Sequence, residues 1–199
     1  PSNAARESVM NTLGKLNFTH EPLFVINSNA GKELAPELKR WPVERWAELT
    51  EKLLSSRKGN VIFTGAKSEM THTEQIISRI PKNLRSRAIS SAGELSLDEL
   101  LALLARASVF VTTDSGPMHL AGLVDAPLVG LFFAETPILY GPLSSRSRVI
   151  YPNFYSLPSF TVYTGKEPIV KENKIARQVS VDEVFRSAEE LLQSTAPVL

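Results

Sequence analysis

Residues 109–119 read Val-Phe-Val-Thr-Thr-Asp-Ser-Gly-Pro-Met-His, and this stretch decides the fold class. Its first four residues form a continuous run of apolar and β-branched side chains, which is typical of a strand buried on both faces. Gly116 and Pro117 then mark the start of a helix, because proline fits the first helical turn. A strand that runs directly into a helix is the repeating unit of a parallel sheet covered by helices.

Similar short apolar runs recur along the chain and alternate with amphipathic stretches. The other strand candidates are residues 23–27, 61–64, 88–90, 128–132 and 148–151. This alternation predicts an α/β fold, a doubly wound, Rossmann-like parallel sheet of about six strands.

Four further helices are indicated by apolar residues at helical spacing. One begins at Trp41-Pro42 and a second covers residues 69–80, whereas capping boxes at 96–99 and 180–183 begin two more, the last over about 180–194. The residues expected on their apolar faces are Trp46, Leu49, Leu53, Ile76, Ile77, Ile80, Leu97, Leu100, Leu101, Leu104, Val181, Val184, Phe185, Ala188, Leu191 and Leu192.

We expect two parts in the chain. Residues 1–22 form an N-terminal lead-in, within which residues 1–5 are set aside because Ser2-Asn3-Ala4 resembles a remnant of tag removal. Residues 23–199 form one domain, a length that suits a single hydrophobic core. Three prolines and a glycine predict a long ordered loop over residues 152–175.

The composition excludes several classes of protein. The 22 Lys and Arg residues nearly balance 21 Asp and Glu residues, so no basic stripe points to nucleic acid. The absence of cysteine excludes disulfides and thiolate chemistry and fits a cytoplasmic protein. Neither a signal peptide nor a run of about 18 apolar residues is present, so no transmembrane segment is expected.

The most informative candidate site is the hexad at residues 114–119, Asp-Ser-Gly-Pro-Met-His. Ligands of parallel sheets bind beyond the carboxyl ends of the strands, and the first N–H groups of a helix attract anions. Gly116 would let an oxygen approach the backbone, Ser115 can donate a hydroxyl, and His119 lies one turn further. A second interpretation stays open, in which Asp114 only caps the helix and His119 packs without contacting a ligand.

Polar residues follow other strands as well. Ser28 and Asn29 come after the first strand, where such side chains also suit a simple turn. Lys39 stands just before a helix start, where a cation is disfavoured unless an anion lies nearby, and a solvated surface lysine is the alternative interpretation. Glu69 follows the second strand, where two interpretations stay open: it holds a ribose diol, or it only stabilises the start of the next helix. Residues 90–95 are placed to wall a nucleobase, and residues 133–137 to contact a sugar.

Several common chemistries have no matching motif. Gly31-Lys32 lacks the spacing of a P-loop, and no Gly-x-Gly-x-x-Gly follows the first strand, which argues against a NAD- or FAD-dependent dehydrogenase. The histidines at 20, 72 and 119 lack metal-ligand spacing, and the first two are expected at the surface. We therefore expect neither a cofactor nor a metal.

The hexad and Lys39-Arg40-Trp41-Pro42 together resemble the signature of glycosyltransferase family 9, the ADP-heptose:lipopolysaccharide heptosyltransferases. The segments between residues 23 and 192 also follow the order of that family. The resemblance implies a GT-B enzyme of two Rossmann-like domains, of which this chain would be the C-terminal, donor-binding half.

The resemblance also implies a reaction and a binding site. The reaction is an inverting, metal-independent transfer of heptose or a related sugar from ADP-heptose to the lipopolysaccharide core. Its base would lie on the N-terminal half, so the isolated chain would be inactive. A glycolipid acceptor implies peripheral association with the cytoplasmic face of the inner membrane. The residues expected to bind substrate are Ser28, Asn29, Lys39, Glu69, Glu94, Leu95, Asp114, Ser115, Gly116, Pro117 and His119.

Two loops depart from the family pattern. Ser28-Asn29 stands where Pro-Gly is usual, and Phe133-Ala134 follows Phe132 where the family has Phe-Gly-Pro. Both loops would face the donor, so they leave the identity of the sugar open. They also motivate an alternative function, a non-catalytic nucleotide-binding or interaction module on a glycosyltransferase scaffold.

Overall fold

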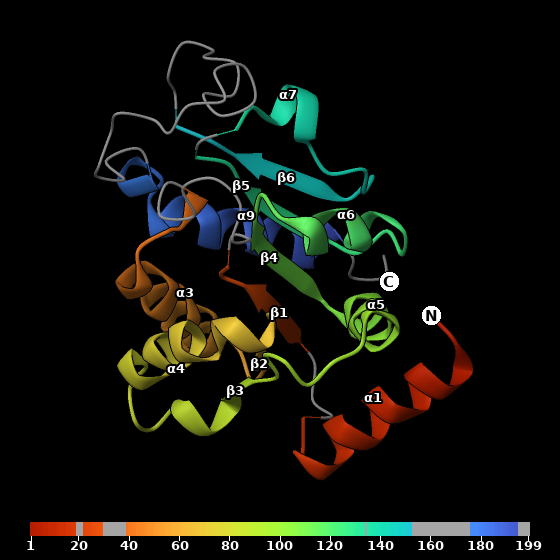
Figure 1. The fold of residues 1–199 in the computed structure, drawn as a ribbon. Helices are drawn as coiled ribbons and strands as arrows, with labels where there is room; N and C mark the ends of the chain where they lie inside the picture. The colour runs from red at the N-terminus through yellow and green to blue at the C-terminus, as the bar shows by residue number, and fades with distance from the viewer. Residues whose placement is uncertain (19–21, 30–38, 134, 153–175, 195–199) are drawn as a thin grey trace.

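A computed structural model describes residues 1–18, 22–29, 39–133, 135–152 and 176–194. Six parallel strands form one sheet in the order β3-β2-β1-β4-β5-β6 (Figure 1). The strands are β1 (Leu23–Asn27), β2 (Asn60–Phe63), β3 (Ala88–Ser90), β4 (Val109–Thr113), β5 (Leu128–Leu131) and β6 (Ser147–Ile150). The predicted Rossmann-like α/β fold is confirmed, with each strand within two residues of its expected bounds.

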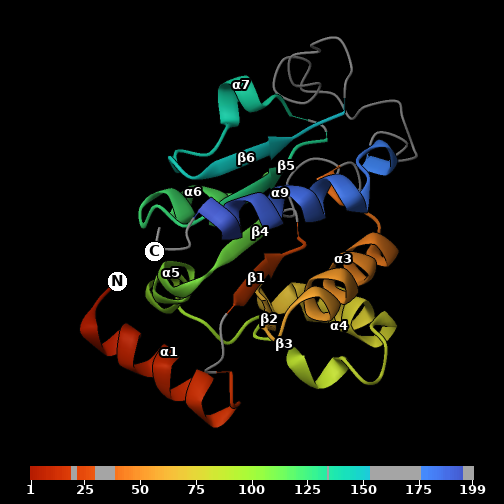
Figure 2. The same ribbon diagram turned by 180° about the vertical axis from the view of Figure 1, so that it is seen from behind.

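Helices cover both faces of the sheet. They are α1 (Asn3–Lys15), α3 (Val43–Ser56), α4 (Met70–Arg79), α5 (Leu97–Arg106), α6 (Gly116–Gly122), the short α7 (Pro137–Tyr140) and α9 (Val181–Ser194). Helices α3, α4 and α9 lie on one face, whereas α1, α5 and α6 lie on the other (Figures 1 and 2). Most of the expected loop, residues 153–175, lies outside the described residues.

Successive strand residues point to opposite faces, so the sheet separates two hydrophobic cores. In β1, Phe24 and Ile26 pack with α3, α4 and α9, whereas Leu23 and Val25 pack with α1 and α5. All five residues of β1 are buried. The continuous apolar run of this strand therefore reflects burial on both faces.

Helix α1 is part of the packed domain and not merely a lead-in to it. Its N-cap Ser2 accepts a hydrogen bond from the Ala5 N–H, and the Ser2 hydroxyl donates to Asp98 at 2.6 Å. Ala5, Val9 and Leu13 are buried in the same core as α5. These three residues lie four apart and so share one face of the helix, which is the face that covers the sheet.

The helices predicted from residues 96–99 and 180–183 form as expected. On their apolar faces, Leu97 differs from expectation, and Leu101 is only partly buried. Leu100 and Leu104 in α5 are buried, but Leu97 is 73% exposed, so the expectation for Leu97 was wrong. Leu97 is the first residue of the helix and lies beyond the edge of the core, while Leu103 fills the inward position instead. Among the described residues no helix is long and apolar enough to cross a membrane.

The two leucines of α5 give a matched test of the core. We expect Leu104→Ala to lower the free energy of unfolding by about 2–5 kcal/mol, because it leaves a cavity in a fully buried site. Leu97→Ala should change it by less than about 0.5 kcal/mol. Urea denaturation of both variants measures the difference, and equal losses would contradict this packing.

Candidate functional site

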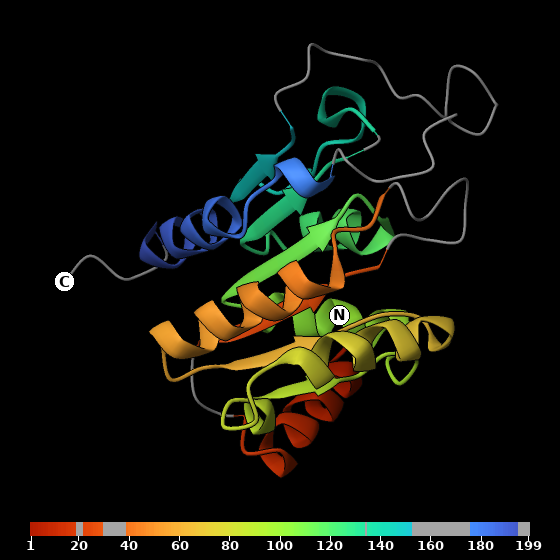
Figure 3. The ribbon, with the colours of Figure 1, turned by 90° about the vertical axis from the view of Figure 1, so that its left-hand side faces the viewer.

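The site lies at the edge of the sheet where the parallel strands end. The strands in view in Figure 3 point the same way, which brings their carboxyl ends together. Hydrogen bonds link the following turns across this edge: the Thr113 hydroxyl donates to the Asn29 carbonyl at 2.8 Å, and the Gly93 N–H donates to the Gly65 carbonyl at 2.8 Å. The order of connections reverses between β1 and β4, the place where ligands bind in such sheets.

Lys39 is held at this edge by the tryptophan that follows it. Trp41 is buried and packs edge-on against Trp46, with ring centroids 5.1 Å apart. Its indole N–H donates to the carbonyl of Val179 at 3.1 Å. These contacts fix the backbone two residues after Lys39 and so limit where its ammonium group can reach.

The ammonium group of Lys39 lies between two carboxylates from neighbouring strand ends. Its Nζ is 3.5 Å from Oδ2 of Asp114, which follows β4, and 3.6 Å from Oε1 of Glu135, which follows β5. The side chains of Lys39, Asp114 and Glu135 are 23%, 13% and 4% exposed. This group of three residues, the Lys39 triad, carries a formal charge of −1 when all its members are ionised.

Asp114 experiences opposing influences within the triad. Burial raises the pKa of its carboxyl above the ordinary value of 3.8, and the Glu135 carboxylate acts in the same direction. The charge and hydrogen bond of Lys39 oppose this rise, as does His119. Because burial is the largest cause, ionised Asp114 reduces the stability of the folded chain.

Helix α6 begins one residue later than an Asp114 cap would require. Its N-cap is Ser115, whose hydroxyl donates to the Thr113 carbonyl at 3.1 Å and does not cap the helix. Asp114 is therefore free of a capping role and pairs with Lys39 instead. His119 is exposed, and a Cβ added to Gly116 would meet no described atom within 4 Å, which leaves open space beside the backbone. Pro117 occupies the first turn, as predicted.

Glu69, Asn29 and Gly65 lie together where β2 ends. A Cβ added to Gly65 would lie 2.8 Å from Nδ2 of Asn29 and 3.0 Å from Oε2 of Glu69, so any larger residue would displace these two side chains. The Glu69 carboxylate accepts a hydrogen bond from the Ala66 N–H at 2.7 Å. Glu69 thus starts the following helix and reaches the same edge as Asn29.

Ser28 and His72 differ from expectation. Ser28, which was expected to bind substrate, is completely buried, and its hydroxyl has no hydrogen-bond partner among the described residues. His72 is half-buried under the same turn and not at the surface. Burial and the charge of Arg40 lower the pKa of His72, opposed by a hydrogen bond with the Ser28 backbone. His20 lies outside the described residues.

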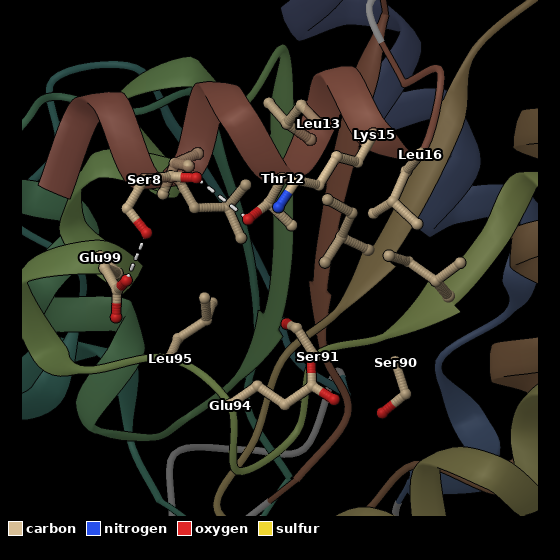
Figure 4. A pocket seen from close by; sticks show the side chains of 14 residues that line it. Ser8, Thr12, Leu13, Lys15, Leu16, Ser90, Ser91, Glu94, Leu95 and Glu99 are labelled. Carbon is tan, nitrogen blue, oxygen red and sulfur yellow. Dashed lines mark hydrogen bonds between the residues drawn. The ribbon is translucent and has the colours of Figure 1, made fainter.

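Glu94 and Leu95 border a pocket of about 620 Å³ between α1 and the sheet (Figure 4). Thr12 and Lys15 of α1 line one wall, and Ser91 and Glu94 line the opposite one. The floor is apolar and includes Ile62, Ile89 and Leu103. A flat, mainly apolar group with polar edges would fit such a pocket. Among the described residues no three acidic or histidine side chains gather as a metal site.

The sequence matches the family model of glycosyltransferase family 9 (heptosyltransferase) over residues 2–169. The chain belongs to glycosyltransferase family 9. The match begins at Ser2, the N-cap of α1, and so includes this helix, which packs into the domain.

Two curated relatives illustrate how much of a family member this chain represents. It is 35% identical to lipooligosaccharide heptosyltransferase 2 of Haemophilus influenzae over 126 residues, which is 63% of this chain and 36% of the relative. It is 36% identical to lipopolysaccharide heptosyltransferase 2 of Escherichia coli over 120 residues, 60% and 34% of the two chains. The alignments thus span about a third of each relative.

Solved structures show the same fold. E. coli ADP-heptose lps heptosyltransferase II has a TM-score of 0.78 and 23% identity, and covers 98% of this chain. A family 9 glycosyltransferase from Veillonella parvula has a TM-score of 0.81 and 22% identity. In both comparisons this chain covers 53% of the other chain.

Glu135 was predicted only as a member of residues 133–137, a loop expected at this edge in contact with a sugar. The signal in the sequence was a carboxylate in the loop that follows a buried strand. Glu135 reaches Lys39 only because β5 lies next to β4 in the sheet, and this strand order cannot be deduced from the spacing of residues in the sequence.

The electrostatics of Asp114 can be tested by its effect on stability. The folded-state pKa is raised, so the cost of ionisation is absent below about 3.8 and grows as pH rises through the folded-state pKa. Asp114→Asn should therefore raise the free energy of unfolding at pH 7, and this gain should shrink as pH falls toward 4. Urea denaturation across this range measures it.

Asp98→Asn is the matched control of opposite sign. Hydrogen bonds from Ser2 lower the pKa of Asp98, so its contribution to stability is present above pH 3.8 and is lost as pH falls through the lowered pKa. This variant should be less stable at pH 7. A loss of stability in both variants would contradict the proposed cost at Asp114.

Proposed function

We propose that this chain binds the nucleotide-sugar donor of a glycosyltransferase that transfers heptose or a related sugar from ADP-heptose to the lipopolysaccharide core. The observation that carries the proposal is Lys39, held beside Asp114 at the reversal point between β1 and β4. A lysine there offers the positive charge and the N–H donors that a diphosphate requires.

The order of the strands suggests how an extended donor would lie. Glu94 and Leu95 after β3 border the pocket that suits a nucleobase, and Glu69 after β2 would accept hydrogen bonds from the ribose. Lys39, Ser115 and the open backbone at Gly116 would contact the diphosphate. Asn29 is buried and donates toward the Thr64 carbonyl at 3.4 Å, so it supports the turn beside Glu69.

We assign to these residues the stabilisation of the leaving group. A base deprotonates an acceptor hydroxyl, whose oxygen attacks the anomeric carbon from the face opposite the diphosphate. The bond between that carbon and the diphosphate oxygen breaks, the configuration inverts, and the electron pair stays on ADP. Lys39 would stabilise the negative charge that develops on the departing oxygen. The base and the glycolipid acceptor site would lie on the other half of the enzyme.

Binding of ADP to Lys39 is the direct test. We expect the chain to bind ADP and Lys39→Ala to weaken this affinity by about ten- to a hundredfold, the usual effect of losing a charged hydrogen bond. Lys52→Ala removes a lysine of the same charge from a surface pair with Asp182, 2.9 Å away, and should leave affinity unchanged. Isothermal titration calorimetry of the three proteins measures this. Absence of saturable heat with the unmodified chain would refute the proposal.

A non-catalytic nucleotide-binding module is the second candidate, because Ser28 is buried and Glu135 adds negative charge where a donor would bind. Both candidates bind ADP. An activity assay distinguishes them. A protein that contains this chain and an acceptor half should transfer sugar from ADP-heptose to lipopolysaccharide core acceptors if the first candidate is right, and should not if the second is. Peripheral contact with a membrane remains a prediction, which vesicle co-sedimentation of that protein would test.

A further inference from the structure

We propose that Glu135 makes this site selective for a nucleotide that still carries its sugar, by accepting hydrogen bonds from sugar hydroxyls and by repelling the free nucleoside diphosphate. This inference rests on the proposed function and extends it to the discrimination between donor and product.

The first argument is the position of Glu135 along the edge of the sheet. β5 lies next to β4, on the side away from β1, β2 and β3. A donor whose base lies near β3 and whose diphosphate lies at Lys39 and Asp114 continues toward β5. The group attached to the terminal phosphate is the sugar, so Glu135 is the carboxylate that this group would meet.

The second argument is the charge of Glu135 in its surroundings. Its side chain is only 4% exposed, and its Oε1 lies 3.6 Å from the Lys39 ammonium, which also serves Asp114 at 3.5 Å. When a diphosphate binds to Lys39, the ammonium group has to neutralise the charge of the diphosphate as well as that of the two carboxylates. Little water reaches Glu135 to screen its carboxylate, so this negative charge acts strongly on a second anion placed beside Lys39.

The two nucleotides differ in what they offer to this carboxylate. The terminal phosphate of ADP is a monoester-like group with up to two negative charges and no hydroxyl beyond it. In a nucleotide-sugar the same phosphate is a diester with one negative charge, and the sugar supplies hydroxyl donors. Glu135 would therefore bind the donor and disfavour ADP. This arrangement would also promote release of ADP once the sugar has left.

The test compares ADP with ADP-heptose by calorimetry on the unmodified chain and on Glu135→Gln. The unmodified chain should bind ADP-heptose more tightly than ADP. Glutamine keeps the size of the side chain but removes its charge, so the affinity for ADP should rise by about tenfold and the preference for ADP-heptose should largely disappear. Glu190→Gln, which removes an equal charge from a half-exposed side chain on α9, should change neither value.

Glu135→Asp separates the two effects and shows whether the position must be a long carboxylate. The charge remains, so ADP should bind as weakly as before, whereas the shorter side chain should weaken ADP-heptose binding. Thermal melting curves confirm that each variant is folded. Equal changes in the affinity for both ligands, or no change in Glu135→Gln, would overturn the inference while Lys39-dependent ADP binding leaves the proposed function intact. Failure of the unmodified chain to bind either ligand would instead refute the proposed function.

Discussion

The pairing of β1 with β4 is the constraint on which the site depends. Residues 24–27 pair in parallel register with residues 109–112, so both strands end at the same edge. At this point strands that are neighbours in the sheet are not consecutive in the chain. β2 and β3 lie on one side of β1, whereas β5 and β6 lie beyond β4 on the other side. Residues 75 positions apart in the sequence, Lys39 and Asp114, are thereby brought within 3.5 Å. Without this register the hexad would be a helix start with no cation beside it.

The burial of two carboxylates at this edge lowers the stability of the fold, but it suits the binding of a ligand. The Lys39 ammonium lies beside two carboxylates that water hardly reaches, and burial raises the pKa of Asp114 despite this ammonium group. A site optimised for folding alone would use one acid or an uncharged pair. Sites that bind charged ligands commonly retain such arrangements at a cost in stability. The Lys39 triad is therefore better explained by what it binds than by what it stabilises.

The fold could be predicted from sequence because its signals are local. The strand at residues 109–113 follows from its apolar run, and the buried faces of α3 and α9 follow from helical spacing. Residues 1–22 and Leu97 show the limit of such signals, since the burial of α1 and the exposure of Leu97 depend on where the sheet ends. The role of Asp114 and the burial of Ser28 and His72 depend on contacts between distant segments, which no local pattern encodes.

The two loops that depart from the family pattern differ in consequence. Ser28 and Asn29 are buried. Asn29 donates to the Thr64 carbonyl and accepts from the Thr113 hydroxyl, so this departure from the family pattern affects how the turn after β1 is held in place. The loop after β5 instead places a charged side chain, Glu135, against the lysine expected to hold the diphosphate. A change in the buried turn after β1 alters how firmly the site is held, whereas a charged side chain after β5 alters which ligand the site accepts. Differences in donor preference within this family should therefore be sought after β5 before they are sought after β1.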